Sequence, residues 1–279
     1  MIVCETVTYR YRDTPAPALV DVDLTVPDGD RLGIVGVTGS GKSTLVQLFN
    51  GLLRATAGRV MVDGEDVADR RVARRLRRRV ALVFQYPEQQ FFAETVLADV
   101  AFGPRQLGVP AGRATAQAEQ ALAAVGLTNP DLWARSPFSL SSGERRRAAI
   151  AAALASDPQV IIVDEPTAGL DPVGRRQIVD LLGGLAAGGR TLVAVSHRLE
   201  DIVALCSSVA VLQAGRLVAS GPIRQVLGDP RVVAAAGLDV PVPVRFLADL
   251  RQRGWPVRTD RLTVAEAVAE LGPPPPASA

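Results

Sequence analysis

An α/β fold is the structure that the sequence predicts, and three segments of its 279 residues indicate it. The first is a glycine-rich block, Gly36–Ser43, which follows the apolar run Leu32–Val35. The second is the β-branched run Val160–Val163, which ends in two acidic residues. The third is Phe138–Glu144, a serine-rich block that is also suited to hold phosphate. Together they predict an ATPase that closes as a sandwich of two chains.

The glycine-rich block has the sequence and the surroundings of a P-loop. It stands between a strand-like run and the helical pattern Leu45–Phe49, which is the order that this phosphate-binding motif requires. Glycines let backbone N–H groups turn inward, and the following helix N-terminus adds partial positive charge. We expect Lys42 to reach the β and γ phosphates and the Ser43 hydroxyl to bind Mg²⁺. The alternative, a glycine-rich turn without chemistry, is disfavoured by the Lys-Ser ending.

The carboxyl end of the run Val160–Val163 should place two acids beside that loop. A β-branched run is typical of a buried parallel strand, and open α/β sheets bind ligands at the carboxyl ends of their strands. We expect Asp164 to hold the Mg²⁺ shell and Glu165 to polarise the attacking water. The alternative is that the two acids only cap the next helix.

Two more polar residues follow strand-like runs. His197 is the only histidine and comes after Thr191–Val195 and Ser196. A lone histidine is more often structural than catalytic, but a place at the same sheet edge favours a catalytic role. Gln85 closes the run Val80–Phe84. It is predicted to be a ligand to Mg²⁺ or to a water that senses the γ-phosphate, with a polar strand cap as the alternative.

The block Phe138–Glu144 precedes an alanine-rich helical pattern, Arg145–Ala155. Its serines are suited to cap that helix. A helix N-terminus with free N–H groups can also grip the nucleotide of another subunit. The two roles are compatible.

These motifs resemble one family closely, the ATPase subunits of ABC transporters, and within it the subunits of energy-coupling factor (ECF) importers. The resemblance covers nearly the whole chain. Its motifs are Walker A at Gly36–Ser43, the Q-loop glutamine Gln85, the signature Leu140–Glu144, Walker B at Val160–Asp164, the D-loop Ala168–Asp171 and the switch histidine His197. The narrower similarity to ECF importers rests on Val83–Phe92, Thr95-Val96 and Asp99–Pro104.

The resemblance implies a full set of site residues in an ABC-type nucleotide-binding domain with a mixed sheet, an antiparallel edge and a helical insertion. The expected catalytic residues are Glu165, His197 and Gln85, and the expected Mg²⁺ ligands are Ser43, Gln85 and Asp164. The expected nucleotide-binding residues are Tyr11, Gly36, Gly39, Ser40, Gly41, Lys42, Ser43 and Thr44. The residues expected to act across a dimer are Ser141, Ser142, Gly143 and Glu144, with Asp171 in the D-loop.

Two features of this set carry open alternatives. Tyr11 is expected to stack on adenine, but Tyr9 and Tyr11 on one strand would share a face, so simple packing explains them equally well. The signature departs from the family's Leu-Ser-Gly-Gly-Gln, because Ser142 replaces the first Gly and Glu144 the Gln. Glu144 is familiar in the family. Ser142 adds a Cβ where backbone should approach the partner's γ-phosphate, which predicts a weaker closure, as in the weaker site of an unequal pair.

Composition sets further limits. No run reaches the roughly eighteen apolar residues of a membrane span, and the N-terminus lacks a signal pattern. Cys4 and Cys206 have no metal-ligand spacing, which suits a reducing compartment. The net charge is +2. The arginine-rich segment Arg70–Arg79 is interpreted as a solvated helix face, and without interleaved aromatic residues it does not indicate nucleic acid.

The chain is expected to divide into a nucleotide-binding domain over residues 1–222, with a helical insertion over about 87–157, and a small domain over 223–271. The run Val209–Gly221 is typical of a hairpin that closes the first domain. The resemblance suggests that the small domain dimerises. Residues 272–279 form a proline-rich tail predicted to be disordered.

The predicted function is ATP hydrolysis, with ATP and Mg²⁺, that powers uptake from the cytoplasmic face of the cell membrane. As the resemblance implies, the partners are a second ABC ATPase subunit, identical or different, and membrane-embedded transporter components. A separate membrane protein would bind the substrate, of the vitamin or transition-metal ion class. The alternative is the ATPase subunit of another ABC transporter.

Other P-loop proteins fit the motifs less well. A small-molecule kinase or GTPase needs no signature, D-loop or switch histidine. A DNA-repair or ribosome-acting ABC ATPase would need a long coiled-coil insertion or a second ATPase domain. The segment Tyr86–Phe92, beside Gln85, is predicted to line the groove for a membrane partner's helix, with core packing of Phe91 and Phe92 as the alternative.

Overall fold

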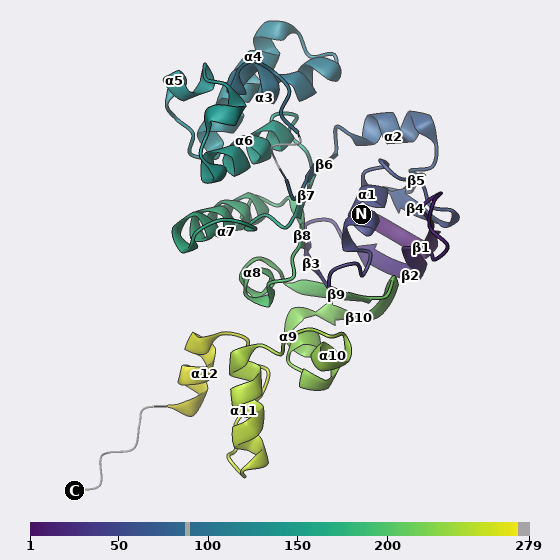
Figure 1. The fold of residues 1–279 in the computed structure, drawn as a ribbon, viewed down its shortest axis with the longest axis vertical. Coiled ribbons are helices and arrows are strands. Elements are labelled where there is room, and N and C mark those ends of the chain that lie inside the picture. The colour runs from purple at the N-terminus through teal and green to yellow at the C-terminus, as the bar shows by residue number, and fades with distance from the viewer. Residues whose placement is uncertain (87–89, 273–279) are drawn as a thin grey trace, which may run out of the picture.

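A computed structural model describes residues 1–86 and 90–272 of the protein. Its larger sheet has six strands in the order β10-β9-β3-β8-β7-β6 (Figure 1). These strands are β3 (Arg31–Val35), β6 (Val80–Val83), β7 (Val160–Asp164), β8 (Thr191–Val195), β9 (Ser208–Gln213) and β10 (Arg216–Pro222). The neighbours from β9 to β6 pair in parallel, whereas β10 pairs antiparallel with β9. The predicted α/β class with a mixed sheet is confirmed.

A smaller antiparallel sheet has the order β2-β1-β4-β5 and lies to the right of the larger one in Figure 1. Its strands are β1 (Ile2–Tyr9), β2 (Leu19–Val26), β4 (Ala57–Val62) and β5 (Glu65–Asp66). Burial alternates along β2, whereas every residue of β7 and β8 is buried. Helices cover both faces of the parallel sheet, which is why its central strands are continuous apolar runs.

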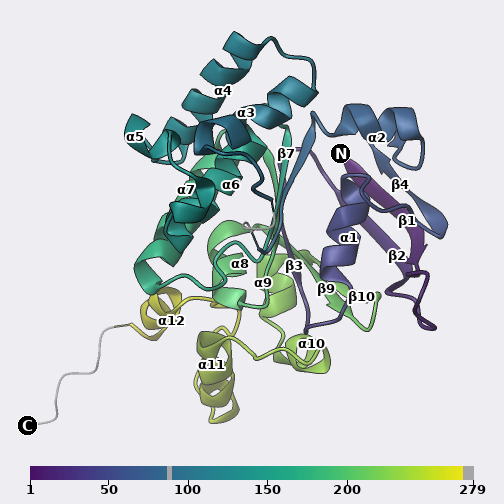
Figure 2. The ribbon, with the colours of Figure 1, turned by 45° about the horizontal axis from the view of Figure 1, so that its top comes forward.

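Helices surround the larger sheet on both sides (Figure 2). The helices are α1 (Lys42–Phe49), α2 (Arg70–Leu76), α3 (Val96–Gln106), α4 (Ala111–Ala124), α5 (Pro130–Trp133), α6 (Ser142–Leu154), α7 (Pro172–Ala187), α8 (Leu199–Leu205), α9 (Ile223–Leu227), α10 (Pro230–Ala235), α11 (Val242–Gln252) and α12 (Val264–Leu271), with a 3₁₀ turn at Pro137–Ser139. Among the helices described, none is long and apolar enough to cross a membrane.

Helices α3 to α6 are inserted between β6 and β7 and form the upper left lobe of Figure 1. Their contacts are made by small residues such as Ala118 and Ala148, both fully buried, around Leu122 and Ile150. The helical insertion predicted over about 87–157 corresponds to these helices, although residues 87–89 lie outside the described part of the chain.

The C-terminal helices α11 and α12 lie below the sheets in Figure 1. They share a small core of Leu247, Val257 and Ala267, and Arg224 of α9 bonds Glu266 of α12 at 2.5 Å. Pro243 lies in the first turn of α11, where a missing N–H costs nothing. The predicted tail falls outside the described residues from 273 onward, and the division into domains stays a prediction.

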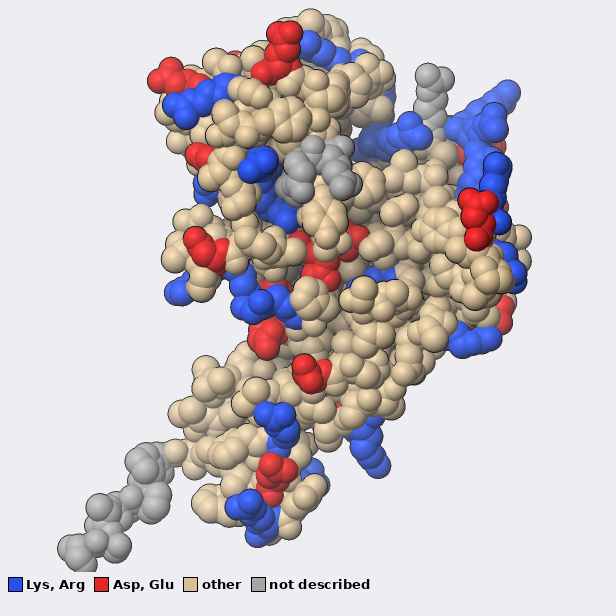
Figure 3. Space-filling model, viewed as in Figure 1, with Lys and Arg blue, Asp and Glu red and all other residues tan. Residues whose placement is uncertain are grey.

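Lys and Arg side chains gather over α2 at the upper right of Figure 3. Arg70, Arg71 and Arg77 are exposed, while Ala73 and Leu76 of the same segment are buried. This arrangement agrees with the interpretation of the segment as a solvated helix face packed by its apolar side.

Candidate active site

The parallel strands bring the predicted site residues to one edge of the larger sheet. Ile34 of β3 pairs with Val195 of β8, which also pairs with Asp164 of β7. The three strands therefore end side by side. The segments that follow them are the P-loop, Glu165 and His197.

The P-loop wraps around the Lys42 ammonium group. Lys42 Nζ donates to the carbonyl oxygens of Gly36, at 2.8 Å, and Val37, at 3.0 Å. Burial lowers the pKa of Lys42, and the charges of Glu165 and Asp164 oppose that shift. The cation is thus held between the loop and the strand-end carboxylates.

Two glycines of the loop have no room for a side chain. Gly36 has φ of 156° and Gly41 has φ of 100°, and an added Cβ would come within 2.2 Å of the Leu212 oxygen or 2.6 Å of the Ala18 oxygen. In the same loop the Ser40 hydroxyl is buried without a hydrogen-bond partner among the described residues. A buried polar atom left unpaired is costly, so this loop is suited to a further polar group.

Glu165 and His197 are in direct contact. Glu165 Oε1 accepts from the His197 backbone N–H at 3.0 Å and lies 2.8 Å from His197 Nδ1. The Ser196 hydroxyl lies 3.4 Å from Oε2. Glu165 has φ of 49° and its N–H donates to the Val195 oxygen at 2.8 Å. A non-glycine residue held in this left-handed conformation is the kind of strain that clusters at functional sites.

Asp164 is buried beside the start of α1. Burial raises the pKa of the Asp164 carboxyl, the Ser43 hydroxyl lowers it by donating a hydrogen bond, the Glu165 charge raises it and Lys42 lowers it. Asp164 and Ser43 therefore present adjacent oxygen atoms next to the P-loop lysine.

Gln85 lies two residues beyond the end of β6 at Val83, because this strand is shorter than the predicted run. Its backbone oxygen accepts from Arg146 at 2.7 Å, and another N–H of the same guanidinium donates to the Ala168 oxygen at 3.1 Å. Arg146 is buried and was not predicted as a site residue. Its signal was helical spacing, since it stands four positions before the buried Ile150.

The signature segment begins helix α6. Ser141 is its N-cap, and the Glu144 side chain completes a capping box by accepting from the Ser141 N–H at 2.8 Å and hydroxyl at 2.7 Å. This hydroxyl holds the pKa of Glu144 below its usual value. Ser142 is exposed at the first helical position. Asp171 of the D-loop caps α7 by accepting from the Gly174 N–H at 2.6 Å.

Tyr11 does not lie on the first strand, which ends at Tyr9, so the expectation of two tyrosines alternating along a strand was wrong. The chain turns after Tyr9, and the two rings meet edge to face with centroids 4.8 Å apart. The Tyr11 hydroxyl lies 3.0 Å from Thr44 Oγ1, and 39% of the residue is exposed. Tyr11 is thus attached to the P-loop helix with part of its ring free.

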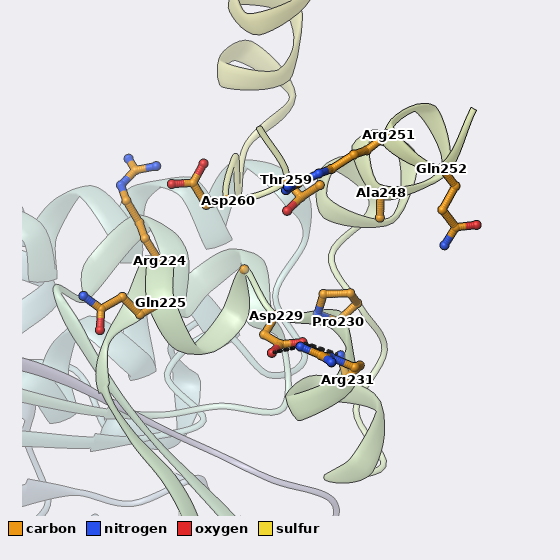
Figure 4. Close-up of a pocket in the computed structure, with 11 residues that line it drawn as sticks. Arg224, Gln225, Asp229, Pro230, Arg231, Ala248, Arg251, Gln252, Thr259 and Asp260 are labelled. Carbon is orange, nitrogen blue, oxygen red and sulfur yellow. Dashed lines mark hydrogen bonds and ion pairs between the residues drawn. The ribbon is translucent and has the colours of Figure 1, made fainter. Parts of the chain in front are cut away.

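Two cavities border the C-terminal segments. One of about 830 Å³ adjoins the P-loop and the switch histidine and is lined by Gly36, Val37, Thr38, residues 197–200, residues 237–242 and Arg245. Another of about 640 Å³ lies among α9, α10 and α11 (Figure 4). Two arginines of the second cavity are neutralised, since Arg224 pairs with Glu266 and Arg231 with Asp229. None of its lining residues belongs to the strand-end site.

Comparison with known proteins identifies the family. A model of the ABC transporter family matches residues 19–168. The energy-coupling factor transporter ATP-binding protein EcfA2 of Symbiobacterium thermophilum is 49% identical over 274 residues, which cover 97% of this chain and 95% of that protein. EcfA2 of Caldanaerobacter subterraneus is 40% identical over 271 residues, covering 95% and 94%.

Solved structures agree with these relatives. CbiO1 from Clostridium perfringens, described as part of the ABC transporter complex cbiONQ, matches with a TM-score of 0.73 at 32% identity, covering 90% of this chain and 98% of that one. A dimeric ATP-binding cassette in a post-hydrolysis state with ADP and Pi matches with a TM-score of 0.72 at 27% identity, covering 80% and 99%. The chain therefore belongs to the ABC transporter ATPases, as an ATP-binding subunit of the energy-coupling factor type whose ATP hydrolysis is coupled to transport.

Proposed function

We propose that this subunit hydrolyses ATP at the strand-end site and completes that site with a second ATP-binding subunit. The observation that carries the proposal is the convergence of Lys42, Asp164 and the Glu165–His197 pair on one sheet edge. Each of these groups has a distinct task in phosphoryl transfer to water.

Lys42 and the P-loop amides hold the phosphates. The lysine now donates to Gly36 and Val37, and these bonds are exchanged for phosphate oxygens when nucleotide binds. The exposed part of the Tyr11 ring is the platform for adenine. Its hydroxyl contact with Thr44 keeps the ring next to the P-loop helix.

The donor set fits Mg²⁺. The adjacent oxygens of Ser43 and Asp164, with the Gln85 amide oxygen, are hard ligands of the kind this ion prefers, and Mg²⁺ commonly combines one or two carboxylates with substrate phosphates and water. Among the described residues no group of three or more His, Cys, Asp or Glu side chains could hold a metal ion. The bound ion would neutralise charge on the phosphates.

Glu165 orients the attacking water. Its carboxylate is fixed by the His197 N–H at 3.0 Å and the His197 ring at 2.8 Å, so its free lone pairs keep one direction. A carboxylate held in this way accepts a hydrogen bond from the water, and positioning of this kind supplies much of the rate in phosphoryl transfer. We assign to His197 the role of linking Glu165 to the γ-phosphate, so that the two are aligned.

The N-terminus of α6 contributes to the nucleotide of the second subunit. Its cap leaves the first helical N–H groups accessible, because Ser142 is exposed and an added Cβ at Gly143 would have no atom within 4 Å. Free N–H groups at a helix N-terminus bind phosphate. The Cβ of Ser142 leaves less room for the γ-phosphate of the second subunit's nucleotide. The ATP site that this signature completes is therefore the weaker one of an unequal pair.

The C-terminal helices provide a second contact between subunits. Val264 and Val268 are spaced by four residues on α12 and are 67% and 61% exposed, and Val242 and Phe246 repeat this spacing on α11. Residues four apart share one helix face. An exposed apolar face on a small domain is suited to association with its counterpart.

The assembly works at the cytoplasmic face of the membrane and powers uptake of a vitamin or a transition-metal ion held by a separate membrane protein. Phe92 and Phe102 form an exposed aromatic pair close to the Q-loop, with ring centroids 4.6 Å apart, and Asp99 accepts from the Phe92 and Ala93 N–H groups at 3.1 and 2.9 Å. We assign this pair to the groove for the membrane component. Gln89, predicted to share the groove, lies outside the described residues.

Copurification tests this assembly. Phe92→Ala should leave the ATPase activity of the isolated subunit within about two-fold of wild type but reduce recovery of the membrane component, because only an exposed contact is removed. Leu52→Ala, which also removes an exposed apolar side chain (46% exposed), is the control. Normal recovery and normal transport with Phe92→Ala would reject the groove, and loss of folding would assign Phe92 to the core.

A further inference from the structure

A buried carboxylate lies behind the catalytic edge of the sheet. Asp201 is in the first turn of α8, four residues after His197, and is 1% exposed. The proposed chemistry does not use it. A buried charge is costly in free energy unless it is fully paired. The partners of Asp201 therefore show which segments this residue connects.

Asp201 joins three segments of the site. Its Oδ2 accepts from the Thr167 hydroxyl at 2.5 Å, and its Oδ1 accepts from Arg175 Nε at 2.6 Å. Thr167 stands two residues after Glu165, and Arg175 lies in the first turn of α7, just after the D-loop Asp171. Asp201, on the helix after the switch histidine, therefore bonds both the segment after Walker B and the helix after the D-loop.

These bonds fix the segments on both sides of the Glu165–His197 contact. Glu165 keeps a left-handed backbone with φ of 49°, a conformation that persists only when its surroundings hold it. Thr167 anchors the chain after Glu165, while α8 anchors the chain after His197. A shift of α8 against the Walker B loop would lengthen the 2.8 Å contact between them.

We infer that Asp201 is a positioning residue that sets the distance between Glu165 and His197. Its bond to Arg175 also links this pair to the start of α7, the helix after the D-loop. The inference rests on the roles proposed above for Glu165 and His197. Displacements of about 1 Å made by residues away from the chemistry can cost as much as 100-fold in rate. Loss of the Asp201 bonds therefore lowers turnover without removing any group that binds nucleotide.

Three variants test the inference. Asp201→Asn removes the charge that pairs with Arg175. Thr167→Val removes the hydroxyl at nearly constant volume, whereas Thr167→Ser keeps it. The control is Glu200→Gln, because Glu200 is the neighbouring carboxylate, lies 4.0 Å from Arg175 and has a side chain that is 73% exposed; an exposed pair of this kind contributes little.

The readouts are kcat, KM and the Kd of a fluorescent ATP analogue, with melting temperature as a folding check. We expect Asp201→Asn and Thr167→Val to lower kcat by roughly 10- to 100-fold while KM and Kd stay within about two-fold. Thr167→Ser should recover most of the lost turnover, and Glu200→Gln should match wild type.

Wild-type kcat in Thr167→Val would overturn the inference, as would a Thr167→Ser variant no better than Thr167→Val. A parallel loss of kcat and nucleotide affinity would do the same, because it would show general damage to the site. Thr167→Val keeps the test decisive if Asp201→Asn fails to fold. If Glu165→Gln is inactive while Thr167→Val is normal, only this inference fails; if Glu165→Gln is active, the proposed role of Glu165 fails first.

Discussion

The capping box of α6 gives a prediction with effects on both stability and turnover. Ser141→Ala removes the hydroxyl that donates to Glu144 at 2.7 Å and accepts from the Glu144 N–H at 3.3 Å. Loss of an N-cap serine costs about 1 kcal/mol. The Glu144 carboxylate still accepts from the residue 141 N–H, so we expect a loss in the lower part of the range, about 0.5–1 kcal/mol. In a protein of this size 1 kcal/mol corresponds to roughly 2–4 °C in Tm.

The same change should depend on pH. The Ser141 hydroxyl lowers the pKa of Glu144 from its ordinary 4.5. A carboxyl with a lowered pKa in the folded state adds stability that is complete above the unfolded value and is lost as pH falls through the folded value. The difference in Tm between wild type and Ser141→Ala should therefore be largest near neutral pH and shrink below pH 4.5.

A matched capping box separates stability from function. Thr263 and Glu266 form the same arrangement at α12, so Thr263→Ala should cost a similar amount of stability. Only Ser141→Ala should also lower ATP turnover, because only α6 carries the signature. Calorimetry and a phosphate-release assay on both variants decide this. Equal turnover in the two variants would refute the role of the α6 N-terminus, and an unchanged Tm in Ser141→Ala would refute the capping energy.

Three further predictions concern single side chains. Lys42→Ala should weaken ATP binding by at least about ten-fold, because a charge-assisted contact with phosphate is lost; tight binding in a fluorescence titration would count against the P-loop assignment. Burial raises the pKa of Asp164 in the folded protein. The unfolded state therefore releases this proton more readily, and the free energy of unfolding falls as pH rises above 3.8. Asp164→Asn should raise Tm without nucleotide at pH 7 while abolishing turnover, and a lower Tm would contradict this linkage. Phe91 is 6% exposed and Phe92 is 61% exposed. In denaturant unfolding, Phe91→Ala should lower the free energy of unfolding by about 3–5 kcal/mol, and Phe92→Ala by less than about 1.5 kcal/mol. Equal losses would reject the distinction between a core Phe91 and a surface Phe92.

The sequence predicted the strand ends well because parallel strands buried on both faces are continuous apolar runs. The runs at Leu32–Val35, Val160–Val163 and Thr191–Val195 are all strands, and the hairpin over Val209–Gly221 is confirmed. Since such strands end at one sheet edge, the order of residues along the chain is enough to place the side chains that follow them near one another.

Contacts between distant segments could not be predicted in this way. Asp201 and Thr167 are 34 residues apart, and Arg146 and Gln85 are 61 apart. A helical pattern shows only that a charged residue faces the core and not which group it meets there. The turn that carries Tyr11 away from the first strand was missed for a related reason. Two tyrosines with alternate spacing are equally compatible with a strand that continues and with one that ends between them.

Glu165 is proposed to orient the water that attacks ATP, and the variant Glu165→Gln examines this role on its own. The amide keeps the size of the side chain and its contact with His197 but removes the negative charge. We expect steady-state hydrolysis to fall by at least about 100-fold. ATP affinity should stay within about two-fold because Lys42 and Ser43 are intact, and ATP-bound dimers should accumulate at twice the 29.4 kDa mass of the chain. Near-normal hydrolysis by Glu165→Gln would contradict the role of Glu165 in orienting the attacking water.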